Sequence, residues 1–208
     1  MVKNWRVWLL GIVALLVMVG ARGMSFWLPV VLTGVTHQHI GQVGLIAMVP
    51  SLAGIIGLYI NATHSDRRKE RQQHVIIPHY LAAFALLSAG IVVLANQNLS
   101  IACLVIAEGC MMAAGGVFWT LPTLILGSQT LGIGLGVIGS IGCIGGIVGP
   151  LFMGVIMSSK DGVHGISLLM GFVGLTQLLA GVIVASLRLE ARERSTTVSV
   201  PFAQGQEI

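Results

Sequence analysis

A dense cluster of charged residues interrupts an otherwise apolar chain at positions 64–71, where the sequence reads His-Ser-Asp-Arg-Arg-Lys-Glu-Arg. Four of the eleven lysines and arginines of the chain fall in this short stretch. Each of these charges would cost about 3 kcal/mol in hydrocarbon, so the cluster must lie in water between two membrane-buried segments. Its basic character assigns it to the cytoplasmic side of a membrane.

The composition fits an integral membrane protein. Hydrophobic residues make up 55% of the chain and charged residues only 9%, whereas a soluble domain carries about 25% charged residues. The basic residues gather at segment ends and form no stripe with interleaved aromatics, which argues against a nucleic-acid partner. Cys103, Cys110 and Cys143 lie in apolar segments without metal-binding spacing, so we expect them to act as small packing residues.

Six apolar segments long enough to cross a membrane can be traced outward from the basic cluster. Backbone N–H and C=O groups find no water in lipid, so each segment must be helical, and the lack of period-two alternation excludes a barrel. The sequence therefore predicts an all-α membrane protein with six transmembrane helices. They cover about residues 5–32, 39–62, 75–95, 99–126, 131–157 and 164–187.

The basic residues are divided unequally between the two ends of these six crossings. Nine lysines and arginines fall on the side of the 64–71 cluster, Lys160 alone falls on the other, and Arg22 lies within the membrane. The positive-inside rule then places both termini in the cytoplasm. We expect residues 1–190 to form the six-helix bundle and residues 191–208 to form a polar, disordered cytoplasmic tail.

Four stretches of the chain resemble the C-terminal half of major facilitator superfamily transporters. Residues 65–74, running into Ile77-Pro78, are similar to the loop between the eighth and ninth helices of that family. The other three stretches are Ser-Phe-Trp-Leu-Pro at 25–29, Val-Phe-Trp-Thr-Leu-Pro at 117–122 and the glycine-rich residues 138–150. The resemblance covers about residues 3–188.

The loop departs from the general superfamily pattern, Gly-x-x-x-Asp-Arg-x-Gly-Arg-Arg, in a way that identifies one branch. Asn61 and His64 stand in place of small residues, and Lys69-Glu70 replaces the Gly-Arg part. This form is similar to that of the anion:cation symporters, which include permeases for 4-hydroxyphenylacetate, tartrate and sugar acids.

The resemblance implies secondary active transport of a small organic anion, coupled to protons, with the substrate held between two six-helix halves. This chain resembles only one half, so the implied partners are the lipid bilayer and an N-terminal six-helix half or a second copy. The implied location is the bacterial inner membrane. The alternative is a truncated or non-transporting membrane fragment. No cofactor is expected, and no constellation of catalytic side chains in the spans indicates an enzyme.

Two charged residues inside the spans are the first candidates for a site. Arg22 is costly in a membrane, and its guanidinium fork suits a substrate carboxylate. Glu108 is the carboxylate within a span, and it would either relay a proton or pair with a cation. Both occur at similar depth on helices that line the cavity by resemblance, so we expect them to face each other. A purely structural ion pair is the alternative for both.

Further residues complete the predicted site. Trp27, Trp119, Thr120 and Ser140 are expected to contact the substrate, although Trp27 would equally serve as an interface anchor. By resemblance, the loop residues Asp66, Arg67, Arg68 and Arg71 form a gate, whereas their charges alone would also fix the topology.

Two other patterns carry weaker predictions. His37 and His39 form a short pair that is expected to be solvated rather than to bind a metal. Glycines recur every three to four residues in the fifth segment, at Gly132, Gly136, Gly139, Gly142, Gly145, Gly146 and Gly149. This stripe permits close backbone approach, either to the missing half or within this bundle.

Overall fold

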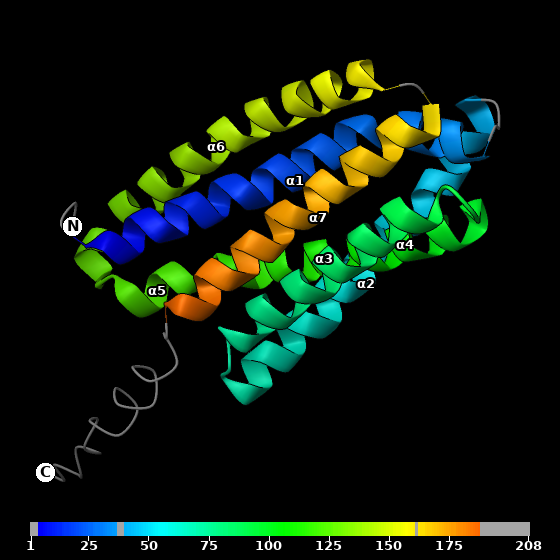
Figure 1. Ribbon diagram of the computed structural model, residues 1–208. Helices are drawn as coiled ribbons and strands as arrows, with labels where there is room; N and C mark the ends of the chain where they lie inside the picture. Colours follow the sequence, from blue (N-terminus) through cyan, green and yellow to red (C-terminus); the bar gives the residue numbers. More distant parts are fainter. Residues whose placement is uncertain (1–3, 37–39, 161, 188–208) are drawn as a thin grey trace, which may run out of the picture.

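The structure is a computed structural model that describes residues 4–36, 40–160 and 162–187, and all regular structure in this part of the chain is helical. His37, His39 and the predicted tail at 191–208 lie outside the described residues. The helices are α1 (Trp5–Thr36), α2 (Ile40–Arg68), α3 (Gln73–Val92), α4 (Gln97–Phe118), α5 (Leu121–Ile125), α6 (Ser128–Ser159) and α7 (Gly162–Ser186) (Figure 1).

Six stretches of these helices are long and apolar enough to cross a membrane, which confirms the predicted six-helix membrane bundle. The fourth crossing consists of α4 and the short α5. Helix α4 ends at Phe118, and Pro122 lies at the start of α5, where a missing backbone N–H does no harm. The fourth and fifth predicted segments, which end near residue 126 and begin near residue 131, are separated in the structure at Gly127, the extended residue that precedes α6 at Ser128.

Helix α2 extends further than the sequence predicted and includes the first charged residues of the basic cluster. Arg67 and Arg68 occupy its last turn, where positive side chains complement the partial negative charge of a helix C-terminus. The helix ends at Arg68. The next residue, Lys69, has a φ of 54°, the left-handed conformation that commonly terminates helices.

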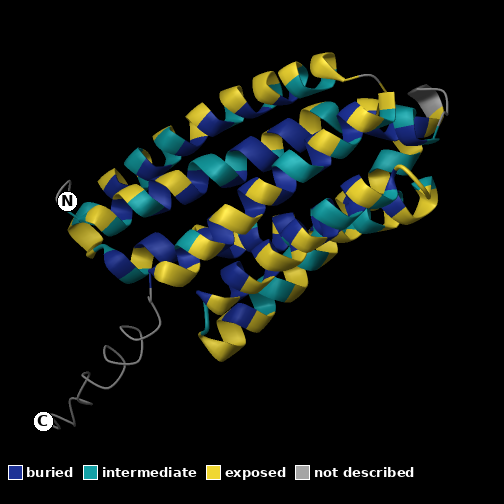
Figure 2. Cartoon of the chain, viewed as in Figure 1, coloured by how far each residue is buried: buried dark blue, intermediate teal, exposed yellow. Residues whose placement is uncertain are grey.

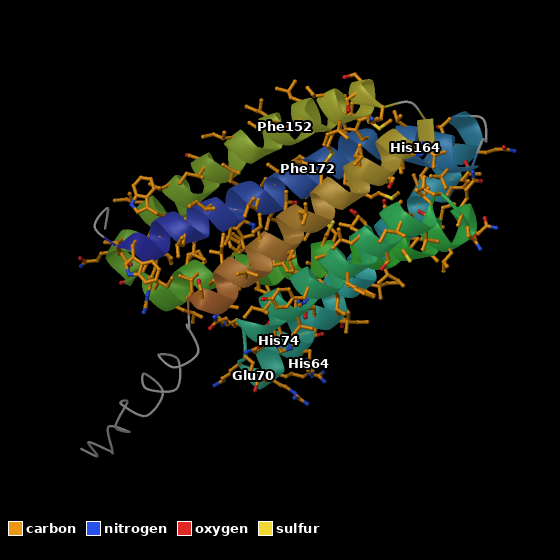
Figure 3. All side chains as sticks on the ribbon, viewed as in Figure 1. His64, Glu70, His74, Phe152, His164 and Phe172 are labelled. Carbon is orange, nitrogen blue, oxygen red and sulfur yellow. The ribbon has the colours of Figure 1, made fainter. Side chains whose placement is uncertain are left out.

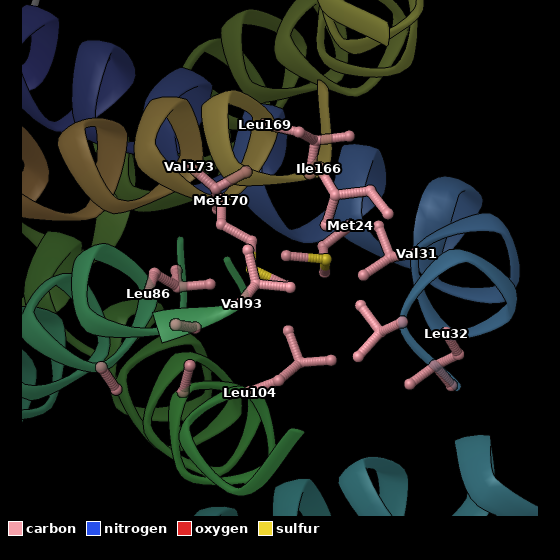
Figure 4. Close-up of a cluster of buried hydrophobic side chains, with 14 of the residues drawn as sticks. Met24, Val31, Leu32, Leu86, Val93, Leu104, Ile166, Leu169, Met170 and Val173 are labelled. Carbon is pink, nitrogen blue, oxygen red and sulfur yellow. The ribbon is translucent and has the colours of Figure 1, made fainter. Parts of the chain in front are cut away.

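The helices lie side by side in the order α6, α1, α7, α3, α4, α2 (Figure 1). Two buried apolar clusters hold this arrangement together, one at each end. One includes Val31 and Leu32 of α1, Leu104 of α4 and Ile166 of α7 (Figure 4). The other joins the start of α1, the start of α3 and the end of α7. The basic cluster therefore lies at the same end as the first turn of α1 and the last turn of α7.

The glycine stripe of α6 divides between two faces. Gly145 and Gly149 are buried where α6 crosses α1, and a Cβ on either would overlap the backbone of Leu15 or Val19. By contrast, a Cβ on Gly132 or Gly136 would meet nothing within 4 Å. The alternative of packing within this bundle therefore holds for the buried glycines, and small residues allow the two helices to approach closely.

Helices α2 and α6, at the two edges of this order, are the most exposed spans. In their most apolar windows, 17% and 22% of residues are buried, against 56% in α1 and α3 and 50% in α7 (Figure 2). Their exposed residues are large and apolar, such as Leu45 and Ile56 on α2 and Ile147 and Leu151 on α6. These faces are suited to lipid or to another apolar protein surface.

Candidate functional site

A cavity of about 440 Å³ lies between α1, α2 and α4. Arg22 and Ser25 of α1 and Glu108 of α4 supply its charged and hydroxyl groups. The rest of its lining is apolar and comes from all three helices. These apolar residues are Ala14, Val17, Met18, Ala21, Leu58, Met111, Met112, Gly115, Gly116, Phe118 and Trp119. Its volume falls within the range of roughly 300–1,000 Å³ that is typical of small-molecule sites.

Arg22 and Glu108 share this cavity, as the sequence predicted, but they do not form an ion pair. Both lie well inside their helices, away from either end. In the described part of the chain, neither side chain makes a salt bridge or a side-chain hydrogen bond. The Cγ atom of Arg22 lies 3.4 Å from the position that a Cβ on Gly146 of α6 would take, so this glycine leaves room for the arginine stem. Both ionisable side chains therefore line a mostly apolar cavity without a direct partner among the described residues, and the expectation of a structural ion pair between them is not met.

Helical periodicity brings these side chains together. On α1, Met18, Arg22 and Ser25 follow one another at spacings of three to four residues, and so do Glu108, Met112, Gly115 and Trp119 at the end of α4. Ser25 and the cavity methionines, Met18, Met111 and Met112, were not predicted from the sequence, although their helical spacing from Arg22 and Glu108 indicates them.

Trp119 lies at the break between α4 and α5, where the chain leaves the helical path. Its side chain is 38% exposed and faces the cavity, with its ring edge-on to Phe118 at 5.4 Å between centroids. The hydroxyl of the adjacent Thr120 donates to the Val117 carbonyl oxygen at 2.7 Å and does not line the cavity. The helix break therefore places the Trp119 ring in the cavity lining, while the Thr120 hydroxyl is used in a hydrogen bond to the backbone.

Trp27 and Ser140 also lie outside the cavity lining. The Trp27 indole N–H donates to the carbonyl oxygen of Pro150 at 3.0 Å and so ties α1 to α6. Ser140 is exposed on α6, and its hydroxyl donates to the carbonyl oxygen of Gly136 in the same helix at 2.8 Å. Within this chain, Trp27 acts as a link between helices, and Ser140 points to the surface.

The predicted gate residues differ in their surroundings. Asp66, Arg67 and Arg68 are exposed, whereas Arg71 is half-buried and its Nη1 lies 3.5 Å from the Thr123 hydroxyl of α5. Gln72, which the sequence analysis did not single out, is buried and donates to the Val184 carbonyl oxygen of α7 at 2.8 Å. The loop is thus fixed to α5 and α7 on one side and presents its charges on the other.

A hydrogen-bonded group at the ends of α2 and α3 supports the same loop (Figure 3). His74 Nδ1 lies 2.6 Å from the Glu70 carbonyl oxygen, and His74 Nε2 lies 2.7 Å from His64 Nδ1. A carbonyl only accepts, so Nδ1 of His74 carries the hydrogen and, in a neutral ring, Nε2 accepts from His64. Asn61 donates to the carbonyl oxygens of His74 and Ala113, each at 2.8 Å.

These contacts explain two of the departures from the general superfamily loop pattern. Asn61 and His64, which stand in place of small residues, are the side chains that connect α2 to α3 and α4. No group of three or more His, Cys, Asp or Glu side chains able to hold a metal occurs among residues 4–36, 40–160 and 162–187.

Six helices long and apolar enough to span a membrane, together with a cavity between them, define a multi-pass membrane protein. The sequence profile of the major facilitator superfamily matches residues 1–150, and the chain belongs to this family of transporters.

Three similar proteins are transporters by name. A quinolone resistance transporter of Acinetobacter baumannii is 30% identical over 202 residues, or 95% of this chain and 45% of that protein. The inner membrane transport protein RhmT of Escherichia coli is 30% identical over 154 residues, 72% of this chain and 34% of its own length. A protein of Agrobacterium vitis, provisionally named a tartrate transporter, is 29% identical over 175 residues, covering 80% and 36% of the two chains. The chain therefore spans less than half the length of these relatives.

Proposed function

We propose that this chain forms one half of a secondary carrier for a small organic anion, coupled to protons, in the anion:cation symporter branch. The observation that carries the proposal is Arg22, an unpaired guanidinium in a cavity between spanning helices. A positive charge held there at a cost of several kcal/mol, on the order of 3, is best explained by an anionic ligand. The name of a similar tartrate transporter supports the same ligand class.

Each cavity residue takes a role in this proposal. Arg22 holds the substrate carboxylate, Glu108 carries the coupled proton, and Trp119 packs against the body of the substrate. Trp27, Thr120 and Ser140 keep their predicted substrate contacts only for an assembled carrier. In that carrier, the exposed Ser140 on α6 would face the second wall of the transport path.

Asp66, Arg67, Arg68 and Arg71 form the proposed cytoplasmic gate. The link of Arg71 to Thr123 supports this role, because Thr123 lies just beyond the helix break that carries Trp119. A shift of the loop would therefore be passed to the end of α4 through α5. The gate also carries the charge that would place this end of the bundle in the cytoplasm.

The apolar faces of α2 and α6 supply the surface for a second half, which we propose to be an N-terminal six-helix chain or a second copy of this one. The lipid bilayer covers what remains, and the name of the similar Escherichia coli protein supports the bacterial inner membrane as its location. A truncated or non-transporting fragment is the alternative, and the unpartnered faces of α2 and α6 are the observation compatible with it.

Reconstitution tests the proposal. The tagged chain is purified from its native membrane in mild detergent with any partner that remains bound, and is placed in proteoliposomes. We expect the complex to accumulate radiolabelled tartrate, gluconate or 4-hydroxyphenylacetate when the outside is acidified, and the chain alone to insert without accumulating them. Arg22→Gln should abolish uptake, while the matched exposed variant Lys160→Gln should not. Undiminished uptake by Arg22→Gln would contradict the proposal, and uptake by the chain alone would indicate a homodimer that is a complete carrier.

A further inference from the structure

The cavity contains an arginine and a glutamate that do not pair with each other. Arg22 projects from α1 and Glu108 from α4, both line the same space, and no salt bridge joins them in the part of the chain that the structure describes. A guanidinium and a carboxylate in a shared apolar cavity would normally pair directly, because each lowers the desolvation cost of the other. Because they do not pair, the same cavity offers one side chain suited to an anionic group and one suited to a cationic group.

The surface around the two charges is apolar and aromatic. Met18, Met111 and Met112 line the cavity together with Phe118 and Trp119. Methionine sulfur and aromatic rings both make favourable contacts with a flat aromatic ligand. Ser25 supplies the one side-chain hydroxyl of this lining. Among the three anions named for the uptake assay, this lining favours the aromatic one, because the hydroxyls of tartrate or gluconate would lose water and find few partners here.

We infer that this cavity binds an aromatic zwitterion, with its carboxylate on Arg22, its ammonium on Glu108 and its ring against Phe118, Trp119 and the methionines. The inference rests on the proposed function, because it keeps the carboxylate on Arg22, and it narrows the substrate to a carboxylate that also carries an ammonium and an aromatic ring. It does not depend on proton coupling, because the ligand's ammonium takes the place of a proton at Glu108 while the zwitterion is bound. The aromatic faces add a cation–π contact to the ammonium.

Three ligands of nearly equal shape test each charge separately. para-Aminomethylbenzoate carries both charges, para-methylbenzoate carries only the carboxylate, and para-methylbenzylamine carries only the ammonium. Binding of each to the purified full chain in lipid nanodiscs is measured by isothermal titration calorimetry. We expect the zwitterion to bind about tenfold tighter than either singly charged ligand, as one further charge-assisted hydrogen bond would provide.

Variants assign each charge to its residue. Glu108→Gln should lower the affinity for the zwitterion to that for para-methylbenzoate, and should leave the affinity for para-methylbenzoate unchanged. Arg22→Gln should lower the affinity for the zwitterion to that for para-methylbenzylamine. The controls Glu70→Gln and Lys160→Gln each remove one charge outside the cavity lining and should leave all three affinities as in the unmodified chain.

The outcomes separate this inference from the proposed function. Equal affinity of the unmodified chain for para-aminomethylbenzoate and para-methylbenzoate would overturn the inference and leave an organic-anion carrier intact. This comparison needs no variant, so a variant that fails to fold does not obscure it. Binding of para-methylbenzylamine alone, with no affinity for either carboxylate, would overturn both.

Discussion

At the scale of single residues, Asn61 shows how one polar side chain near the end of α2 joins three helices beside the basic loop. Its amide group donates to two carbonyl oxygens on two other helices, His74 on α3 and Ala113 on α4. Few groups other than an amide can donate twice from one nitrogen without a charge. Asn61 therefore fixes the end of α2 to α3, which follows the proposed gate loop, and to α4, which carries Glu108.

Replacing this asparagine should weaken the bundle. Hydrogen bonds between membrane helices contribute about 0.6 kcal/mol on average and up to about 1.7 kcal/mol, so Asn61→Leu should cost about 1–3 kcal/mol. Thr63→Ala is the matched control, because the Thr63 hydroxyl bonds only to carbonyls of its own helix. Thermal unfolding in detergent measures both. An Asn61→Leu protein as stable as Thr63→Ala would show that these bonds do not hold the loop.

The sequence predicted some of the site residues and not others, for a physical reason. Arg22 and Glu108 were found because a charge in a span is rare whatever the fold, and Trp119 because it precedes a proline-marked break. Asn61, His64 and His74 were not assigned a role, since their partners are backbone carbonyls and rings that only tertiary packing brings near. The absence of a direct Arg22–Glu108 bond also depends on side-chain positions that depth along a helix does not determine.

At the scale of helices, the crossing of α1 and α6 depends on glycine. A Cβ on Gly149 would fall within contact of the Val19 backbone, and one on Gly142 would lie 3.3 Å from the Ala14 Cβ. Met153 and Gly23 continue the same close contact further along the two helices. This crossing places Arg22, the Trp27–Pro150 bond and the cavity wall of α1 relative to α6.

A pair of alanine substitutions on α6 tests this crossing. Gly149→Ala forces backbone apart and should cost about 1–3 kcal/mol, the usual penalty of overpacking. Gly136→Ala is made on the same helix but meets nothing within 4 Å, so its stability should be unchanged or raised by up to about 1 kcal/mol through better helix propensity. Chemical unfolding of both proteins in mixed micelles is the measurement, and equal losses for both variants would exclude a special role for the buried glycines.

The helical elements were predictable because hydrophobic length and basic clusters leave little freedom. The ends were less so: α2 runs to Arg68 because cations suit its C-terminus, and the fourth crossing divides in two at Trp119 and Thr120. The sequence also left open which glycines of α6 face α1, because seven of them follow the same three-to-four-residue spacing. Only the position of α1 separates Gly145 and Gly149 from the open Gly132 and Gly136.

At the scale of the whole molecule, the two ends of the bundle differ in charge. The first turn of α1, the basic loop and the last turn of α7 share one end through a common apolar cluster. Lys160, between α6 and α7, is exposed at the other. Within the described residues, the basic loop and Lys160 therefore lie at opposite ends of the bundle, and the positive-inside rule predicts which side of the membrane each end faces.

That orientation can be measured in intact cells with single cysteines on a background in which Cys103, Cys110 and Cys143 are replaced by alanine. A membrane-impermeant maleimide should label Asn98→Cys and Lys160→Cys from outside, because both sites are exposed at the end with few basic residues. Arg68→Cys should react only after the cells are opened. Each lysine and arginine raises the cost of moving a loop across the membrane, so the basic end is expected to stay in the cytoplasm. Labelling of Arg68→Cys from outside, together with protection of Lys160→Cys, would show that the bundle has the opposite orientation in the membrane. It would also move the gate to the outer face, where the loop charges would have to be explained by a partner rather than by topology.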